Sequence, residues 1–240
     1  MIILPAIDIK DGRCVRLFKG DFGTVEQVAE DPVQTAGEFE AAGAKWLHMV
    51  DLDGAKDAAR VNREIFLSVA AGTGLKVEVG GGIRDMAAVE DYLSHGIERV
   101  ILGSAAVKNP TFVKEAVKAY GAHIVVGIDA KDERVACEGW LDVGEVHYLD
   151  LARAMEQIGV QTIVYTDISK DGTLSGPNLS QLCAINRAVS CDIVASGGIR
   201  ELADIRALRE NGLYGAICGK SLYKGTLSLR GALAEAGAQE

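Results

Sequence analysis

Residues 76–84 read KVEVGGGIR, a short, mainly apolar run that ends in three glycines and an arginine. A similar pattern returns as DIVASGGIR at residues 192–200, where Gly-Gly-Ile-Arg lies 116 positions after its first copy. Runs of this kind, without polar alternation, are typical of parallel strands that are buried on both faces. We therefore interpret the two segments as equivalent strand-to-helix units of a repeated fold.

Working outward from these segments, the chain holds eight such runs, at 2–7, 46–50, 76–79, 99–102, 123–128, 162–165, 192–195 and 215–218. Helical patterns follow them, at roughly 32–42, 62–71, 85–95, 110–120, 148–158, 178–189, 201–211 and 226–236. Asp31-Pro32 and Asn109-Pro110 are helix-start signals. Dividing 240 residues among eight units gives 30 residues each, which predicts an α/β fold of the (β/α)8 TIM-barrel type. A doubly wound open sheet is the alternative, but it rarely has eight units this even.

Other strand ends repeat as well. Asp51 matches Asp167 at the offset of 116, whereas the stretch around Asp8 matches the stretch around Asp129 at an offset of 121. The five extra residues predict a longer first loop, at about residues 10–30. We expect one domain over residues 1–240 with a two-fold internal repeat of half-barrels, approximately 1–120 and 121–240.

Composition limits the class of partner. The chain carries 25 basic and 34 acidic residues, a net charge of −9, which argues against a nucleic-acid partner. No apolar run approaches the ~20 residues of a membrane span, and the N-terminus lacks the basic region of a signal peptide. The five cysteines are scattered, as in a reducing compartment. We expect a cytoplasmic protein without a membrane partner.

Two sets of small residues lie where strands end, which is the face on which barrels build their active sites. Phosphate groups need converging backbone N–H donors, and glycine permits that close approach. A lone glycine pair is more often a turn, but two matched sets across the mouth predict a ligand with a phosphate at each end. One set is Gly81, Gly82, Arg84, Gly103 and Ser104; the other is Ser196, Gly197, Gly198, Gly219 and Lys220.

Aspartates stand at the ends of other strands, between these two sets. Asp8 and Asp129 are repeat mates, and two carboxylates in one pocket favour one base and one acid because one pKa is pushed up. Asp171, just beyond the sixth strand, is a third candidate for an acid or a base. Alternatively, it belongs to an ordinary Asp-Gly turn. His48 lies inside a strand and is expected either in the barrel interior facing the ligand or as a core histidine.

The sequence indicates chemistry without a cofactor. No spacing of His, Cys and Asp suits a metal, and no Gly-x-Gly-x-x-Gly follows the first strand, so neither a metal nor a dinucleotide is expected. Acid–base chemistry on a sugar phosphate then indicates an isomerase. Trp140 lies in a long segment, 131–144, where it is expected to stack on a planar ring or, alternatively, to belong to a hairpin on the rim.

Together these residues resemble the ProFAR isomerase (phosphoribosylformimino-5-aminoimidazole carboxamide ribotide isomerase) family of histidine biosynthesis. The resemblance covers essentially the whole chain. It is carried by LPAIDIKDG (4–12), LHMVDLDGA (47–55), VGGGIR (79–84), LGSAAV (102–107), TDISKDGTLSGPN (166–178), ASGGIR (195–200) and GKSLY (219–223).

The resemblance implies an Amadori rearrangement of an aminoaldose to an aminoketose by a monomeric enzyme. It implies that Asp8 is the base and that Asp129 is the usually assigned acid, with Asp171 as a competing candidate. It further implies that Thr166 and His48 position the substrate. The glycine-rich sets would hold the two phosphates, and Trp140 would stack on the imidazole.

Three alternatives accompany this interpretation. Some relatives also isomerise phosphoribosylanthranilate and carry an Arg two residues before the tryptophan; here Glu138 stands there and disfavours a second carboxylated substrate. The imidazole glycerol phosphate cyclase has a related barrel, but its Cys-x-Asp pattern is missing from Pro5-Ala6-Ile7-Asp8. A non-catalytic module that binds bis-phosphates is the third.

Overall fold

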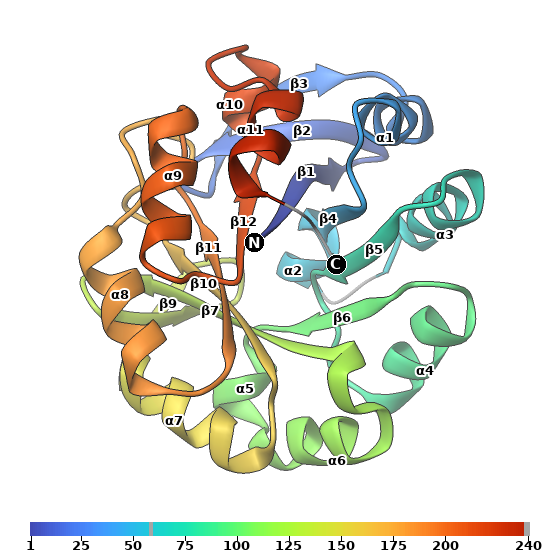
Figure 1. The fold of residues 1–240 in the computed structure, drawn as a ribbon. Helices are drawn as coiled ribbons and strands as arrows, with labels where there is room; N and C mark the ends of the chain where they lie inside the picture. The colour runs from blue at the N-terminus through green and yellow to red at the C-terminus, as the bar shows by residue number, and fades with distance from the viewer. Residues whose placement is uncertain (58–59, 238–240) are drawn as a thin grey trace.

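The computed structural model describes residues 1–57 and 60–237. Within them, eight parallel strands form a closed ring (Figure 1), in the order β10-β11-β12-β1-β4-β5-β6-β7 with β7 paired back to β10. This confirms the (β/α)8 TIM barrel. The ring strands are β1 (Ile2–Lys10), β4 (Trp46–Asp51), β5 (Lys76–Gly80), β6 (Arg99–Leu102), β7 (Ile124–Lys131), β10 (Thr162–Asp167), β11 (Asp192–Ser196) and β12 (Gly215–Cys218).

Helices follow the strands and cover the outside of the ring (Figure 1). The longer ones are α1 (Pro32–Ala41), α3 (Arg63–Gly72), α4 (Met86–Ser94), α6 (Pro110–Tyr120), α7 (Tyr148–Ile158), α8 (Leu179–Ala188), α9 (Leu202–Glu210) and α11 (Leu229–Ala236). Short helices are α2 (Leu52–Asp57), α5 (Ala105–Lys108), α10 (Lys220–Tyr223) and the 3-10 turn η1 (Gly121–His123). None in the described ranges is long and apolar enough to cross a bilayer.

Local signals explain why helices begin where they do. Asp31 accepts hydrogen bonds from the backbone N–H groups of Val33 and Gln34, and Pro32 occupies the first turn of α1. Asn109 caps α6 in the same way, by accepting from the N–H of Phe112. Such caps satisfy N–H groups that have no partner within the helix.

Alternation along the strands divides the apolar side chains into two cores. One core lies between the strands and the helices, and the other fills the barrel interior. The interior core consists of Ile2, Leu4, Ala6, Trp46, Ile101, Val125, Val164, Val194 and Ile217. Because side chains two positions apart share a face, Asp8 continues the interior row of β1 to the mouth.

Two antiparallel hairpins extend the ring beyond the eight units. The connection from β1 to α1 is long, as the sequence predicted, but β2 (Arg13–Phe18) and β3 (Asp21–Ala29) form a hairpin in it that the sequence did not predict. β8 (Arg134–Cys137) and β9 (Asp142–His147) form the second hairpin, around Trp140. Each hairpin continues a ring strand, because β2 pairs with β1 and β8 with β7.

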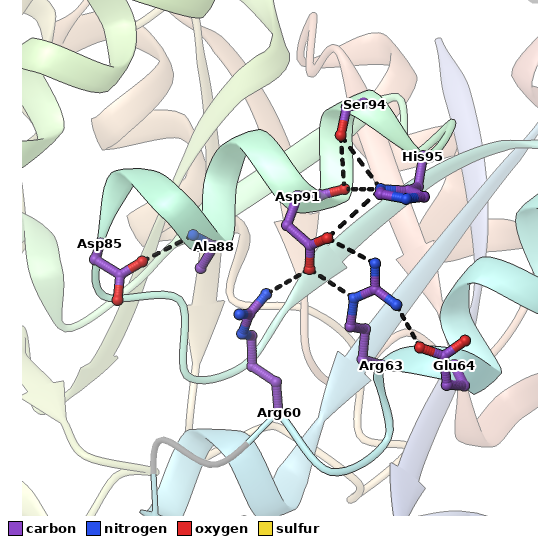
Figure 2. Close-up of polar contacts among 8 residues, drawn as sticks. All are labelled: Arg60, Arg63, Glu64, Asp85, Ala88, Asp91, Ser94 and His95. Carbon is purple, nitrogen blue, oxygen red and sulfur yellow. Dashed lines mark hydrogen bonds and ion pairs between the residues drawn. The ribbon is translucent and has the colours of Figure 1, made fainter.

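A cluster of ionic contacts joins the start of α3 to α4 (Figure 2). One oxygen of Asp91 accepts from Arg60 Nη1 at 2.8 Å and from Arg63 Nε at 2.6 Å, and the other accepts from Arg63 Nη2 at 2.6 Å. The hydrogen bond from Arg63 is the main cause that lowers the pKa of Asp91 to about 2. The cluster also fixes the chain around Asn62, whose amide donates to the buried Asp51 at 2.8 Å.

Replacing Asp91 by Asn tests this cluster. A carboxyl group with a lowered pKa stabilises the fold above its ordinary pKa of 3.8, and this contribution disappears as the pH falls through about 2. We expect Asp91→Asn to lower the thermal midpoint by about 2–4 °C at pH 7 and by much less near pH 2. Thermal unfolding followed by circular dichroism measures both. An equal loss at the two pH values would contradict an ionic role.

Candidate active site

The predicted site residues all line one cavity of about 240 Å³ at the carboxyl ends of the ring strands. The carboxylates Asp8 and Asp129 come from strands on opposite sides of the ring, β1 and β7. The other predicted residues that line it are His48, Gly81, Gly82, Arg84, Gly103, Ser104, Trp140, Thr166, Asp171, Ser196, Gly197, Gly198, Gly219 and Lys220. The cavity thus brings both glycine-rich sets and the candidate acids and bases into one space.

Asp8 forms an ion pair with Arg16, a residue that the sequence analysis missed. Arg16 Nη1 lies 2.5 Å from Asp8 Oδ2, and both side chains are largely buried. Arg16 stands on β2, and the β1–β2 pairing sets Asp8 opposite Val15, next to Arg16. A guanidinium group is always charged, so Asp8 faces a fixed positive charge. The only signal in the sequence was an arginine in an apolar stretch, Cys14–Leu17.

The same guanidinium group lies against Gly219. A Cβ atom placed on Gly219 would fall 1.0 Å from Arg16 Nη2, so a side chain there would displace Arg16. Gly219 therefore makes room for a cation between Asp8 and the glycine-rich set on β11 and β12. Arg16 is placed to contact both the carboxylate and an anion held by that set.

Asp129 and Asp171 are two further carboxyl groups of the cavity, and burial raises the pKa of each. Burial raises the pKa of Asp129, while hydrogen bonds from Trp140 and Thr166 lower it. Burial raises the pKa of Asp171 to about 6; Arg16 lowers it, and the negative charges of Asp8 and Asp129 raise it. Desolvation disfavours the charged form of an acid, so these two side chains are suited to carry a proton.

The loop after β10 places Asp171. Its backbone carbonyl accepts from the N–H of Lys19 at 3.2 Å, in the turn of the β2–β3 hairpin. The next carbonyl, of Gly172, accepts from Lys220 Nζ at 2.8 Å. The hairpin and Lys220 therefore hold Asp171 over the cavity.

The two glycine-rich sets face each other across the mouth, because β5 and β6 lie opposite β11 and β12 in the ring. Backbone packing requires glycine at some of these positions, independently of any ligand. Gly82 has φ +75°, and a Cβ atom there would lie 2.2 Å from the carbonyl oxygen of Gly54. Its repeat mate Gly198 has φ +84° and would clash with the carbonyl of Gly176 at 2.4 Å. Packing of the chain against itself thus already requires glycine here.

The hairpins meet over the cavity. A Cβ atom on Gly20 would lie 2.1 Å from Trp140 Cε3, so the indole ring packs directly on that glycine. Phe22 lies against Gly139 in the same way. The backbone N–H of Glu138 donates to Ser104 Oγ at 2.9 Å, and its carboxylate pairs with Lys108. Trp140 therefore belongs to a rim hairpin and lines the cavity, whereas its stacking on a planar ring stays a prediction.

Asp51 and Asp167 organise turns beside the site. Asp51 Oδ1 accepts from the N–H of Gly54 at 2.9 Å, and Asp167 Oδ1 accepts from the N–H of Ser169 at 2.9 Å. Each also accepts from an asparagine amide, Asn62 and Asn178 respectively, which are themselves 116 positions apart. In the part of the chain that the structure describes, no group of three His, Cys, Asp or Glu side chains could hold a metal ion.

Comparison with known proteins agrees with this arrangement. A family model described as "Histidine biosynthesis protein" matches residues 2–228. A protein of Listeria welshimeri is 54% identical over 229 residues, 95% of both chains. One of Clostridium botulinum (strain Kyoto / Type A2) is 49% identical over 233 residues, 97% of this chain and 96% of that one. Both are named 1-(5-phosphoribosyl)-5-((5-phosphoribosylamino)methylideneamino) imidazole-4-carboxamide isomerase.

The raised pKa of Asp171 predicts a stability change. The folded protein keeps a proton on Asp171 that the unfolded chain releases near 3.8, so stability falls as the pH rises from about 4 to about 6. We expect Asp171→Asn to be more stable than the wild type at pH 8 by about 2 kcal/mol and to show little gain at pH 4. Urea unfolding at both pH values measures this.

The matched control is Glu115→Gln, which removes an exposed carboxylate on α6; we expect no comparable gain. A variant Asp171→Asn that is no more stable at pH 8 than the wild type would contradict the desolvated state of this carboxyl group.

Proposed function

The chain belongs to the histidine biosynthesis protein family and is an isomerase; we propose that it converts the aminoaldose ProFAR into the aminoketose PRFAR. The observation that carries the proposal is the set of three aspartates in one cavity, one paired with arginine and two with raised pKa values. They lie between two glycine-rich sets that face each other across the mouth. Such a site suits proton transfers on a ligand that carries a phosphate at each end.

We assign the base to Asp8. In an Amadori rearrangement, an acid first protonates the ribose ring oxygen, and the ring opens to a Schiff base. A base then removes the C2′ proton, and the resulting enolamine takes up a proton at C1′ and relaxes to the ketose. The ion pair with Arg16 fixes the position of the Asp8 side chain in the cavity, and a positioned base contributes roughly 10²–10⁴-fold to the rate.

We assign the acid to Asp171 in preference to Asp129. The pKa of Asp171 is raised to about 6, so about a tenth of the group carries a proton at pH 7, roughly a hundredfold more than at the ordinary pKa of an aspartate. Asp129 receives hydrogen bonds from Trp140 and Thr166, and donors of this kind favour its charged form. Asp129 and Thr166, which are register partners on the neighbouring strands β7 and β10, then orient the sugar, with Asp129 as the alternative acid.

The two phosphate groups of ProFAR would occupy the two glycine-rich sets. Arg84 flanks the set on β5 and β6, and Arg16 and Lys220 flank the set on β11 and β12. These cations supply local positive charge despite the net charge of −9, because interactions between exposed charges are screened beyond roughly 8 Å. Every group assigned a role belongs to one chain, so a monomer suffices.

The alternatives are disfavoured. Glu138 stands where an arginine would bind the carboxylate of phosphoribosylanthranilate, and its own carboxylate pairs with Lys108. We therefore propose that phosphoribosylanthranilate is not a substrate. Both relatives described above are named as the isomerase rather than the cyclase. A passive bis-phosphate-binding module would not need carboxyl groups with raised pKa values between its phosphate sites.

Asp8→Asn tests the base. Asparagine keeps the shape of the side chain and cannot accept the C2′ proton, so we expect kcat to fall by 10³-fold or more while substrate affinity changes by less than about tenfold. Turnover of synthetic ProFAR coupled to the downstream cyclase, and isothermal titration, measure these quantities. A near-wild-type rate would refute the assignment.

Lys220→Ala tests the phosphate set on β11 and β12. Removing one cation from an anion site weakens binding more than chemistry, so we expect KM to rise about tenfold and kcat to change by less than threefold. The control is Lys224→Ala, which removes a nearby exposed lysine that pairs with Glu26 outside the cavity. An unchanged KM in Lys220→Ala would count against the phosphate assignment.

A further inference from the structure

A fourth carboxylate, Glu78, lies inside the barrel below the mouth. Glu78 is 0% exposed, and its Oε1 lies 2.7 Å from Nδ1 of His48 on the neighbouring strand. The two residues are register partners in the pairing of β4 with β5. The other oxygen, Oε2, has no hydrogen-bond partner among the described residues.

The internal repeat shows that the barrel does not need this pair for packing. The positions 116 residues after His48 and Glu78 are Val164 and Val194, which are register partners in the pairing of β10 with β11. Both valines belong to the apolar interior core. A buried polar pair costs desolvation free energy that two aliphatic side chains avoid, and replacing such pairs by apolar ones is often stabilising. Only one half of the barrel carries the polar pair, which indicates a role in the site rather than in packing.

His48 lies where it can meet the ligand. Its side chain lines the same cavity as Asp129. Because Nδ1 is engaged by Glu78, Nε2 is the one ring nitrogen left for a ligand. A carboxylate oxygen accepts hydrogen bonds, so we assign the hydrogen of this contact to Nδ1. Neutral His48 is then fixed in the tautomer whose Nε2 accepts a hydrogen bond.

We infer that Glu78 is a positioning residue of the isomerase: it fixes the ring and tautomer of His48 so that Nε2 accepts a hydrogen bond from a sugar hydroxyl beside Asp129. This inference rests on the proposed function for the identity of the ligand. The contact from Glu78 to His48 is present without a ligand, so it is testable on the free protein.

The first measurement is the tautomer of His48, read from its two ring nitrogens by ¹H–¹⁵N correlation NMR of the free protein at pH 8. The signals are assigned by their loss in His48→Val. We expect a protonated Nδ1 and an unprotonated Nε2 in the wild type, and a mixed or reversed pattern in Glu78→Val. A wild-type His48 with its hydrogen on Nε2 would overturn the inference, whatever the reaction of the enzyme.

The second measurement is turnover of ProFAR. A misplaced positioning group costs up to about 10²-fold in rate, so we expect Glu78→Val to lower kcat by roughly tenfold to a hundredfold with KM within threefold. Glu78→Gln keeps a carbonyl oxygen that accepts the same hydrogen bond and should recover most of the rate. If Glu78→Val does not fold, Glu78→Gln still tests the inference.

The matched control is the double variant His48→Val with Glu78→Val, which reproduces the pair found in the other half of the barrel. We expect it to be at least as stable as the wild type and to remain slow. A double variant with wild-type kcat would show that the pair is merely structural and would overturn the inference. Failure of the wild type to turn over ProFAR would instead refute the proposed function and leave the tautomer result standing.

Discussion

Eight parallel strands that close into a ring must present all their carboxyl ends at one rim. This constraint brings together residues as distant in sequence as Asp8 and Lys220, which line the same cavity. It also places β1 opposite β7, and the pair β5–β6 opposite the pair β11–β12. Carboxylates therefore lie between the two glycine-rich sets without any special arrangement of loops, and the ligand that we propose would span the mouth from one set to the other.

Within that cavity, the aspartates differ in their electrostatic surroundings. Arg16 pairs with Asp8, while burial raises the pKa of Asp129 and of Asp171. Three identical functional groups thus have different electrostatic surroundings, and differences of this kind allow a single pocket to run acid and base steps at one pH. Burial of a carboxyl group lowers the stability of the native state, which is a common conflict between stability and activity.

Much of the fold was predictable because strands buried on both faces are recognisable without knowledge of their neighbours. Eight apolar runs such as 76–79, each followed by a helical pattern, indicated the barrel, and the repeated Gly-Gly-Ile-Arg supported it. The hairpin β2–β3 was not predicted, since most of β3 is exposed and its pattern lacks an apolar face. Arg16 was missed with it, because its contact with Asp8 follows from the pairing of β1 with β2. Glu78 was missed because its partner, His48, is defined only by the register of β4 and β5.

The central claim is that the two glycine-rich sets hold the two ends of one ligand while the aspartates act on its middle. A crystal structure of the protein with the aminoketose product tests this most directly. The account predicts one phosphate at Gly81, Gly82 and Ser104, the other at Gly197, Gly198 and Gly219, and C1′ and C2′ between Asp8 and Asp171. Both phosphates on one side of the mouth, or reacting carbons out of reach of these carboxyl groups, would contradict it.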